Sequence, residues 1–259
     1  MTTSANPSDL DRLVEGTHHD PHSVLGGHEL PGGGAVVRVR RPEARAVSMT
    51  VGGKTYRADH VAGGVWELEL PELPGPEVPV HVDYEAFGVD VVDPYRFWPT
   101  LGEIDLHLIN EGRHEQLWDV LGARVTEHQG VRGVAFSVWA PGARSVRVVG
   151  EWNSWDGRLH PMRALGASGV WELFVPDARP GLRYRYEILG ADGHVRLKSD
   201  PLARQAEAPP ANASVVFESD HRWSDDDWMA RRKERDFVND RLSVYEVHAG
   251  SWRTKPEDG

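Results

Sequence analysis

The sequence predicts an all-β protein built from two tandem immunoglobulin-like β-sandwich modules with short linking helices. Three observations lead to this fold class. The chain contains an internal repeat, its strand-like runs are short and bounded by turn residues, and its helix signals are confined to the joints between those runs. The 27 Gly and 18 Pro residues among 259 supply the many turns that short strands need.

The repeat consists of two pairs of matching segments. Residues 36–49, VVRVRRPEARAVSM, resemble residues 135–148, AFSVWAPGARSVRV. The run GVWELELP, which begins at Gly64, resembles GVWELFVP, which begins at Gly169. The two copies are spaced by about the length of one immunoglobulin-like sandwich, roughly 100 residues. The tryptophan of the second run recurs in both copies, which predicts a structural role for it.

Seven runs in these two copies carry the signal of a β-strand. Their residues alternate between apolar and polar types or are β-branched, and Gly, Pro or Asn residues bound them. The predicted strands are residues 45–51, 65–70, 79–86, 134–140, 144–150, 170–175 and 182–189.

Helix signals occur at the joints. Ser8 is a candidate N-cap for a short helix in which Leu10, Leu13 and Val14 share one face. A second helix is predicted within residues 111–121, where apolar residues recur at helical spacing before a glycine.

A third helix is predicted to begin at Ser224. Three aspartates follow in its first turn and basic residues come later, which is the charge order that favours the helix dipole. Residues 242–248, LSVYEVH, then form a compact apolar and β-branched run that predicts a buried strand.

Charge and composition argue against several functional classes. The net charge of −11, from 29 basic and 40 acidic side chains, disfavours a phosphate-binding surface for nucleic acid and gives no attraction to an anionic membrane. No apolar stretch approaches the ~20 residues of a spanning helix, and the first residues lack the pattern of a secretory signal. The chain has no cysteine. We therefore expect a cytoplasmic protein without nucleic-acid or membrane partners.

One histidine-rich loop could hold a metal ion. His18, His19, Asp20, His22 and His28 offer the ligand types that zinc or iron accepts. Their spacing fits no defined ligand pattern, and loop histidines that bond to backbone groups are the commoner outcome. We therefore predict no metal site.

A carboxylate cluster at Glu218, Asp220 and residues 225–227 could supply a general acid and base. The start of a helix explains it better, because acidic residues are favoured in a first turn. The chain also lacks a G-x-S-x-G elbow and a phosphate-binding loop. We predict no catalytic residue and no cofactor.

The strongest candidate for a binding site directly follows the predicted strand 144–150. Trp152 and Trp155 stand on a polar loop, where an indole face can stack on a glucose ring while Asn153 or Arg185 donates to hydroxyl groups. The alternative is that one or both indoles fold back onto the sandwich, since tryptophan is highly buried on average.

These residues belong to a set that resembles one family, the N-terminal part of bacterial 1,4-α-glucan (glycogen) branching enzymes. The W-A-P and W-N-x-W pieces are shared by family 48 carbohydrate-binding modules, whereas the first and last segments are more specific to branching enzymes. The matching segments are residues 20–26 (DPHSVLG), 117–123 (LWDVLGA), 137–143 (SVWAPGA), 152–157 (WNSWDG), 160–163 (HPMR) and 245–252 (YEVHAGSW).

The resemblance implies a domain order. Residues 1–110 would form an N-terminal β-sandwich, residues 111–222 a family 48 carbohydrate-binding-like module, and residues 223–259 a linker helix and the first strand of a truncated (β/α)₈ barrel. The family's catalytic carboxylates lie on later barrel strands. The chain would therefore be a non-catalytic part of a glycosyltransferase of glycogen biosynthesis that forms α-1,6 branches, and it would contact α-glucan and support the catalytic barrel.

For the sugar site, the resemblance implies roles for three residues. Trp155 matches a stacking tryptophan of glycogen-binding family members, next to Trp152 on the same loop, and Arg185 falls where such members carry a basic side chain. Their second stacking tryptophan, expected near residues 192–193, is absent.

Two other functions stay open at this point. A debranching or trehalose-releasing enzyme of the same superfamily shares W-A-P but is expected to lack the D-P-H-S-V-L-G opening. A stand-alone glycogen-binding or scaffolding module belongs to a different class, and the apolar run at residues 242–248 disfavours it.

Overall fold

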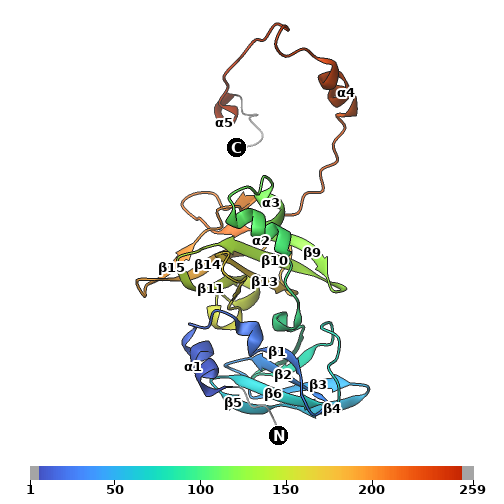
Figure 1. Cartoon of the computed structure of the whole chain (residues 1–259), viewed down its shortest axis with the longest axis vertical. Coiled ribbons are helices and arrows are strands. Elements are labelled where there is room, and N and C mark those ends of the chain that lie inside the picture. The colour runs from blue at the N-terminus through green and yellow to red at the C-terminus, as the bar shows by residue number, and fades with distance from the viewer. Residues whose placement is uncertain (1–5, 253–259) are drawn as a thin grey trace. The chain divides into compact units, whose positions relative to one another are not determined.

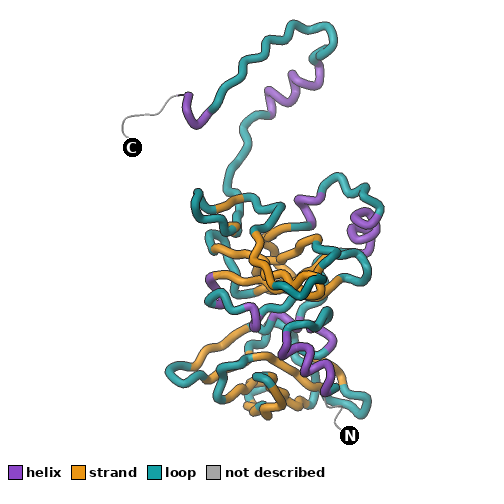
Figure 2. Tube along the Cα trace, turned by 90° about the vertical axis from the view of Figure 1, so that its left-hand side faces the viewer, coloured by secondary structure: helices purple, strands orange, loops and turns teal. Residues whose placement is uncertain are grey.

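The computed structural model describes residues 6–252 (Figure 1). The chain divides into two compact units with the break between Glu218 and Ser219, and each unit is described by itself. The described residues of the first unit form antiparallel sheets joined by turns and short helices, as the tube view also shows (Figure 2). The predicted all-β fold class is confirmed.

The first sandwich consists of two sheets with the strand orders β1-β2-β6-β5 and β4-β3-β7-β8. Their apolar side chains, including Val39, Met49, Leu68 and Val82, share one buried core. The strands are β1 (Gly26–Glu29), β2 (Ala35–Arg40), β3 (Ala46–Val51), β4 (Lys54–Arg57), β5 (Asp59–Ala62), β6 (Val65–Leu70), β7 (Val80–Asp83) and β8 (Gly88–Val91).

The second sandwich pairs the sheet β12-β13-β10-β9 with the sheet β11-β14-β17-β16, in which β15 also pairs with β14. Its core is rich in aromatic residues, among them Phe136, Trp171, Tyr184 and Tyr186. The strands are β9 (Gly122–His128), β10 (Val131–Trp139), β11 (Ala143–Gly150), β12 (Arg163–Ala164), β13 (Val170–Val175), β14 (Arg183–Gly190), β15 (Val195–Lys198), β16 (Gln205–Ala206) and β17 (Ser214–Val215). All seven predicted strands are present.

The repeat has one structural cause in both sandwiches. Gly64 and Gly169 have left-handed φ angles of +79° and +75°. A Cβ atom at Gly64 would lie 2.3 Å from the Cα of Pro42, and one at Gly169 would lie 2.7 Å from the Cβ of Pro141. Only glycine combines this backbone conformation with such close packing against proline.

The repeated tryptophans complete the same arrangement. The Nε1–H of Trp66 donates to the carbonyl of Arg41 at 3.2 Å, and that of Trp171 donates to the carbonyl of Ala140 at 3.1 Å. The acceptor residues directly precede the repeated prolines, Pro42 and Pro141. Both indoles are buried, which confirms the structural role predicted for them.

The first helix, α1 (Pro7–Glu15), begins two residues earlier than the sequence indicated. Its N-cap is Asn6, whose side chain accepts from the backbone N–H of Ser8, so Ser8 is not the cap. Proline at the first helical position suits this start because it has no N–H to satisfy. Leu10 and Leu13 are buried as expected, whereas Val14 is exposed.

The helix predicted within residues 111–121 is only partly formed. Two short helices, α2 (Glu103–Asn110) and α3 (Leu117–Val120), flank a turn. Gly112, with a φ of +65°, closes α2 by donating its N–H to the carbonyl of Ile109. A left-handed glycine is a common helix stop, and the prediction overlooked it.

Short 3₁₀ turns, η1 (Pro21–Ser23) and η2 (Pro94–Arg96), lie where the two sandwiches meet. Leu13, Leu25 and Tyr95 share one hydrophobic cluster with core residues of the second sandwich. The hydroxyl of Tyr95 donates to the carbonyl of Pro161 at 3.0 Å, and the hydroxyl of Ser145 donates to that of Gly16 at 2.7 Å. The division between modules at residue 110 stays a prediction.

In the second unit, α4 (Asp226–Glu234) carries acidic residues in its first turn and basic residues in its last, as predicted. The strand predicted at residues 242–248 is wrong in this structure, because residues 241–248 have no regular secondary structure and their side chains are exposed. Within the described part of the unit no strand lies beside this run, and an unpaired strand leaves its backbone groups without partners. The segment ends in α5 (Ala249–Trp252).

The repeated glycine offers a direct test of the fold. Gly169→Ala adds both left-handed strain and a clash with Pro141, whereas Gly166→Ala adds only the strain, because nothing lies within 4 Å of a Cβ there. We expect Gly169→Ala to lower the free energy of unfolding by about 1–3 kcal/mol more than Gly166→Ala, measured by urea denaturation. Equal losses would contradict the packing role assigned to this glycine.

Candidate functional site

The loop that carries Trp152 and Trp155 consists of two 3₁₀ turns, η3 (Glu151–Asn153) and η4 (Gly157–Leu159), which follow β11 directly. The loop folds back onto the strand end, because the backbone N–H of Trp155 donates to the carbonyl of Gly150 at 2.9 Å. A hydrogen bond from the backbone N–H of Arg158 to the Asp156 side chain, at 2.9 Å, starts the second turn.

Asn153 holds this loop in place. It is 3% exposed, and its Oδ1 accepts from the N–H of Gly150 at 2.9 Å. Its Nδ2 donates to the carbonyl of Val148 at 3.1 Å and to Nδ1 of His160 at 2.9 Å. The expectation that Asn153 donates to a sugar is therefore wrong, since buried backbone and imidazole groups already use its amide.

His160 is suited to accept the hydrogen bond from the Asn153 amide. Burial, with a smaller contribution from the charge of Arg41, lowers the pKa of His160 from 6.5 to about 3. The imidazole is therefore neutral at physiological pH, and its Nδ1 can accept the hydrogen bond from Asn153.

The tip of the loop has an unusual backbone conformation. Ser154 and Trp155 have left-handed φ angles of +52° and +62°, which residues other than glycine adopt at a cost. The Trp155 side chain is 41% exposed, so the strained turn presents an indole face to solvent. Strain of this kind tends to persist at ligand-binding positions.

Trp152 is placed differently from Trp155. Its indole stacks on Phe136 of the core, with 5.0 Å between ring centroids and 23° between ring planes, and it meets His160 edge-on. Trp152 thus follows the alternative in which the ring folds back onto the sandwich. Its Nε1–H is buried and has no hydrogen-bond partner among the described residues.

Arg185 lies on β14, opposite Val149 of β11. The neighbouring pair of the same ladder is Tyr184 with Gly150, the residue whose carbonyl accepts from Trp155. The structure therefore brings Arg185 and the backbone of Trp155 to the same end of one sheet. Within the described residues the Arg185 guanidinium forms no hydrogen bond or ion pair, and its Nε is buried.

Two residues of the histidine-rich loop, His18 and His28, bond to backbone groups, which is the outcome that the sequence favoured. His18 accepts the backbone N–H of Asp20 at its Nδ1, His28 contacts the carbonyl of Leu25, and His22 packs edge-on against Tyr95. Across residues 6–252, no group of three or more His, Asp or Glu side chains is arranged to hold a metal ion.

The carboxylate cluster is also explained by structure. Glu218 receives two hydrogen bonds from Arg132, at 2.7 and 2.8 Å. Asp226 and Asp227 lie in the first turn of α4, as the helix dipole favours.

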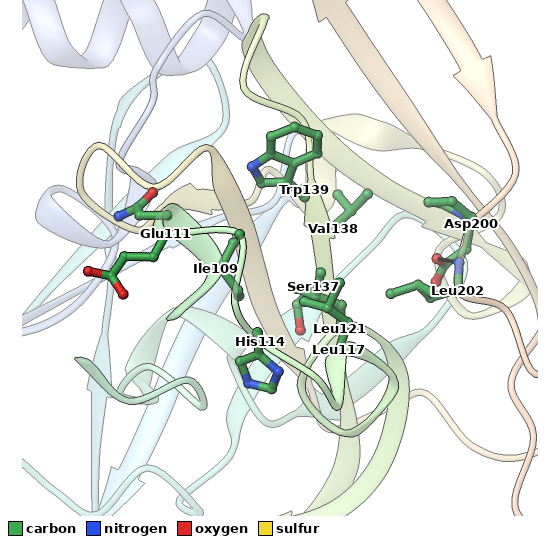
Figure 3. Close-up of a pocket in the computed structure, with 13 residues that line it drawn as sticks. Ile109, Glu111, His114, Leu117, Leu121, Ser137, Val138, Trp139, Asp200 and Leu202 are labelled. Atoms are coloured by element: carbon green, nitrogen blue, oxygen red, sulfur yellow. Dashed lines mark hydrogen bonds between the residues drawn. The ribbon is translucent and has the colours of Figure 1, made fainter. Parts of the chain in front are cut away.

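A cavity of about 600 Å³ lies beneath α2 and α3, beside the exposed Trp139, and contains none of the predicted site residues (Figure 3). Apart from Asn110, its polar side chains are already paired. Ser137 donates to a backbone carbonyl, His114 contacts a carboxylate, and Asp200 accepts from two tyrosine hydroxyls. The cavity therefore offers mainly apolar surface rather than the free donors and acceptors that a sugar needs.

Among the described residues, no helix combines the length and the hydropathy that crossing a membrane would require.

An immunoglobulin-like sandwich with an exposed indole on a strained polar loop has the features of a carbohydrate-binding module. Residues 120–203 match carbohydrate-binding module 48, the isoamylase N-terminal domain. Residues 6–95 match the N-terminal domain of the alpha-1,4-glucan branching enzyme GlgB. These two matches confirm the resemblance stated from the sequence, namely to the N-terminal part of bacterial 1,4-α-glucan branching enzymes, including a family 48 carbohydrate-binding module.

Curated relatives are similar in sequence to this chain over almost its whole length. The 1,4-alpha-glucan branching enzyme GlgB of Frankia casuarinae is 56% identical over 95% of this chain, which spans 31% of that protein. GlgB 1 of Streptomyces coelicolor is 50% identical over 98% of this chain, which spans 33% of that protein. The chain thus spans about a third of the length of these relatives.

A solved structure, the maltotriose complex of a pullulanase variant from Klebsiella pneumoniae, is 18% identical. The similarity covers 75% of this chain and 24% of that one, with a TM-score of 0.34.

The Asn153 network can be tested by stability. Asn153→Ala leaves the Gly150 N–H, the Val148 carbonyl and His160 without their partner, so we expect the free energy of unfolding to fall by about 2–4 kcal/mol in urea denaturation. Ser154→Ala, in the same loop and exposed, should change it by less than about 0.5 kcal/mol. Similar values for the two variants would show that the amide does not hold the loop.

Proposed function

We propose that this chain is the N-terminal, non-catalytic part of a 1,4-α-glucan branching enzyme that forms α-1,6 branches in glycogen. Its own role is to contact α-glucan and to support the catalytic barrel. The single observation that carries the proposal is the exposed indole of Trp155, held on a strained loop beside the unpaired guanidinium of Arg185.

The chemistry of an α-glucan suits this pair. The apolar face of a glucose ring can stack on the Trp155 indole, and Arg185 can donate to its hydroxyl groups. Trp152 supports the site as the wall behind the loop, with its ring held by the core. We expect modest affinity, because the tip of the β14–β15 hairpin carries an ion pair between Asp192 and Arg196 rather than a second indole.

The proposed domain division is the one that the family resemblance implies. We propose domains at residues 1–110, 111–222 and 223–259, with the last leading into a catalytic barrel that supplies the carboxylates of the reaction. The chain itself would need no cofactor and no metal. The cytoplasm is the compartment in which we place the parent protein.

The two alternatives have less support. Relatives named as branching enzymes match nearly the full chain at 50–56% identity, which favours that function over a debranching or trehalose-releasing enzyme. A stand-alone glycogen-binding or scaffolding module would use the same loop, so the binding experiment below does not depend on which context is right.

The proposal predicts weak retention of the chain in a glycogen-containing native gel. Trp155→Ala should weaken the affinity by about three- to tenfold, because one aromatic stacking contact contributes roughly 0.5–1.5 kcal/mol. Trp118→Ala is the control, since Trp118 is similarly exposed but lies on α3. Unchanged retention of Trp155→Ala, or equal losses for both variants, would contradict the assignment of this loop.

A further inference from the structure

A groove of about 600 Å³ separates the β7–β8 hairpin of the first sandwich from the Trp152 loop of the second. Ser154 and Asp156, which flank Trp155 in the sequence, both line this groove. Trp155 itself does not line the groove, so the loop that carries it forms one side of the groove while its indole lies outside.

The groove contains hydrogen-bonding groups that the protein does not use. Asp177 and Arg179 line it and are exposed, and their side chains form no hydrogen bond or ion pair with other described residues. Although Asp177 is exposed as a residue, partial burial of its carboxyl raises the pKa of that group, an effect that the charge of Arg41 reduces. Trp152 contributes to the wall as well, and its buried Nε1–H has no partner among the described residues.

An aromatic pair forms the opposite side of the groove. Tyr84 and Phe87, at the turn of the β7–β8 hairpin, contact each other with 5.1 Å between ring centroids. Phe87 is 62% exposed, although a large apolar side chain gains by burial. An exposed aromatic ring that faces free polar groups is an arrangement that binds sugars, because a pyranose has both an apolar face and a rim of hydroxyls.

The charges of the groove favour a neutral ligand. Glu151 and Asp156 are paired with Arg183 and Arg158, and the protein carries a net charge of −11. An anionic ligand would be opposed by this charge, and the remaining donors and acceptors suit a polyhydroxyl compound.

We propose that the groove is a second α-glucan-binding site, in which Phe87 and Tyr84 form the stacking surface, Asp177 and Arg179 bind hydroxyl groups, and the Trp152 indole forms part of the wall. The inference rests on the proposed function and extends it: one glucan chain that stacks on Trp155 continues across the groove onto the first sandwich. The N-terminal module is then a sugar-binding element and not only a support.

The test is the affinity of the full chain for maltoheptaose, measured by isothermal titration calorimetry. Phe87→Ala should weaken binding by about three- to tenfold, and it should not disturb folding, since the ring is exposed. Trp98→Ala is the matched control, because Trp98 is 73% exposed and does not line the groove. In the wild type, the Nε1–H resonance of Trp152, assigned with Trp152→Phe, should shift when maltoheptaose is added.

The outcomes separate the two proposals. Loss of affinity in Trp155→Ala but not in Phe87→Ala, with an unmoved Trp152 resonance, would contradict glucan binding in the groove and leave the proposed function intact. Loss in Phe87→Ala alone would support the groove and contradict the role of Trp155. No measurable binding by the wild type would overturn both.

Discussion

The joint between the two sandwiches depends on the buried carboxylate of Glu172. Glu172 is fully buried on β13, and Arg163 donates to both of its oxygens at 3.2 and 3.3 Å. The backbone N–H of Thr100 also donates to Glu172, and Arg163 donates to the carbonyl of Phe97. Removing one partner of a buried pair typically costs about 3–5 kcal/mol, because the other charge is left unpaired. The segment that connects the sandwiches is thereby fixed to the second one.

The proposed sites depend on this joint. Because the connecting segment is held by Glu172 and Arg163, and Tyr95 donates across the same boundary, the first sandwich contributes one wall of the groove and the second contributes the other. Asp93 lies at this boundary as well. Burial raises its pKa to about 6, an effect that the nearby Arg41 and Arg96 reduce. Buried ionic groups of this kind add little net stability.

Local signals in the sequence were sufficient for most of the fold. Alternating apolar residues located the strands, and the two repeated segments marked a glycine and a tryptophan in one and a proline in the other, which make the same contacts twice. The features that were missed depend on contacts distant in sequence. The charge of Glu172 within an otherwise apolar strand was a visible sign of a buried partner, but nothing local indicated Arg163. Asn153 was assigned to the ligand because its three loop contacts exist only once the loop has folded. The run at residues 242–248 has a strand composition, yet a strand also requires a neighbour.

The central claim is that the Trp155 loop and the adjoining groove, rather than the apolar cavity beside Trp139, contact the glucan. Hydrogen–deuterium exchange of the full chain with and without maltoheptaose tests this claim most directly. We predict slower exchange in residues 151–157 and 84–91 when the sugar is present, because bound sugar shields these exposed turns and restricts their opening. Protection at residues 109–117 beneath α2 and α3, with none at the two turns, would contradict the account.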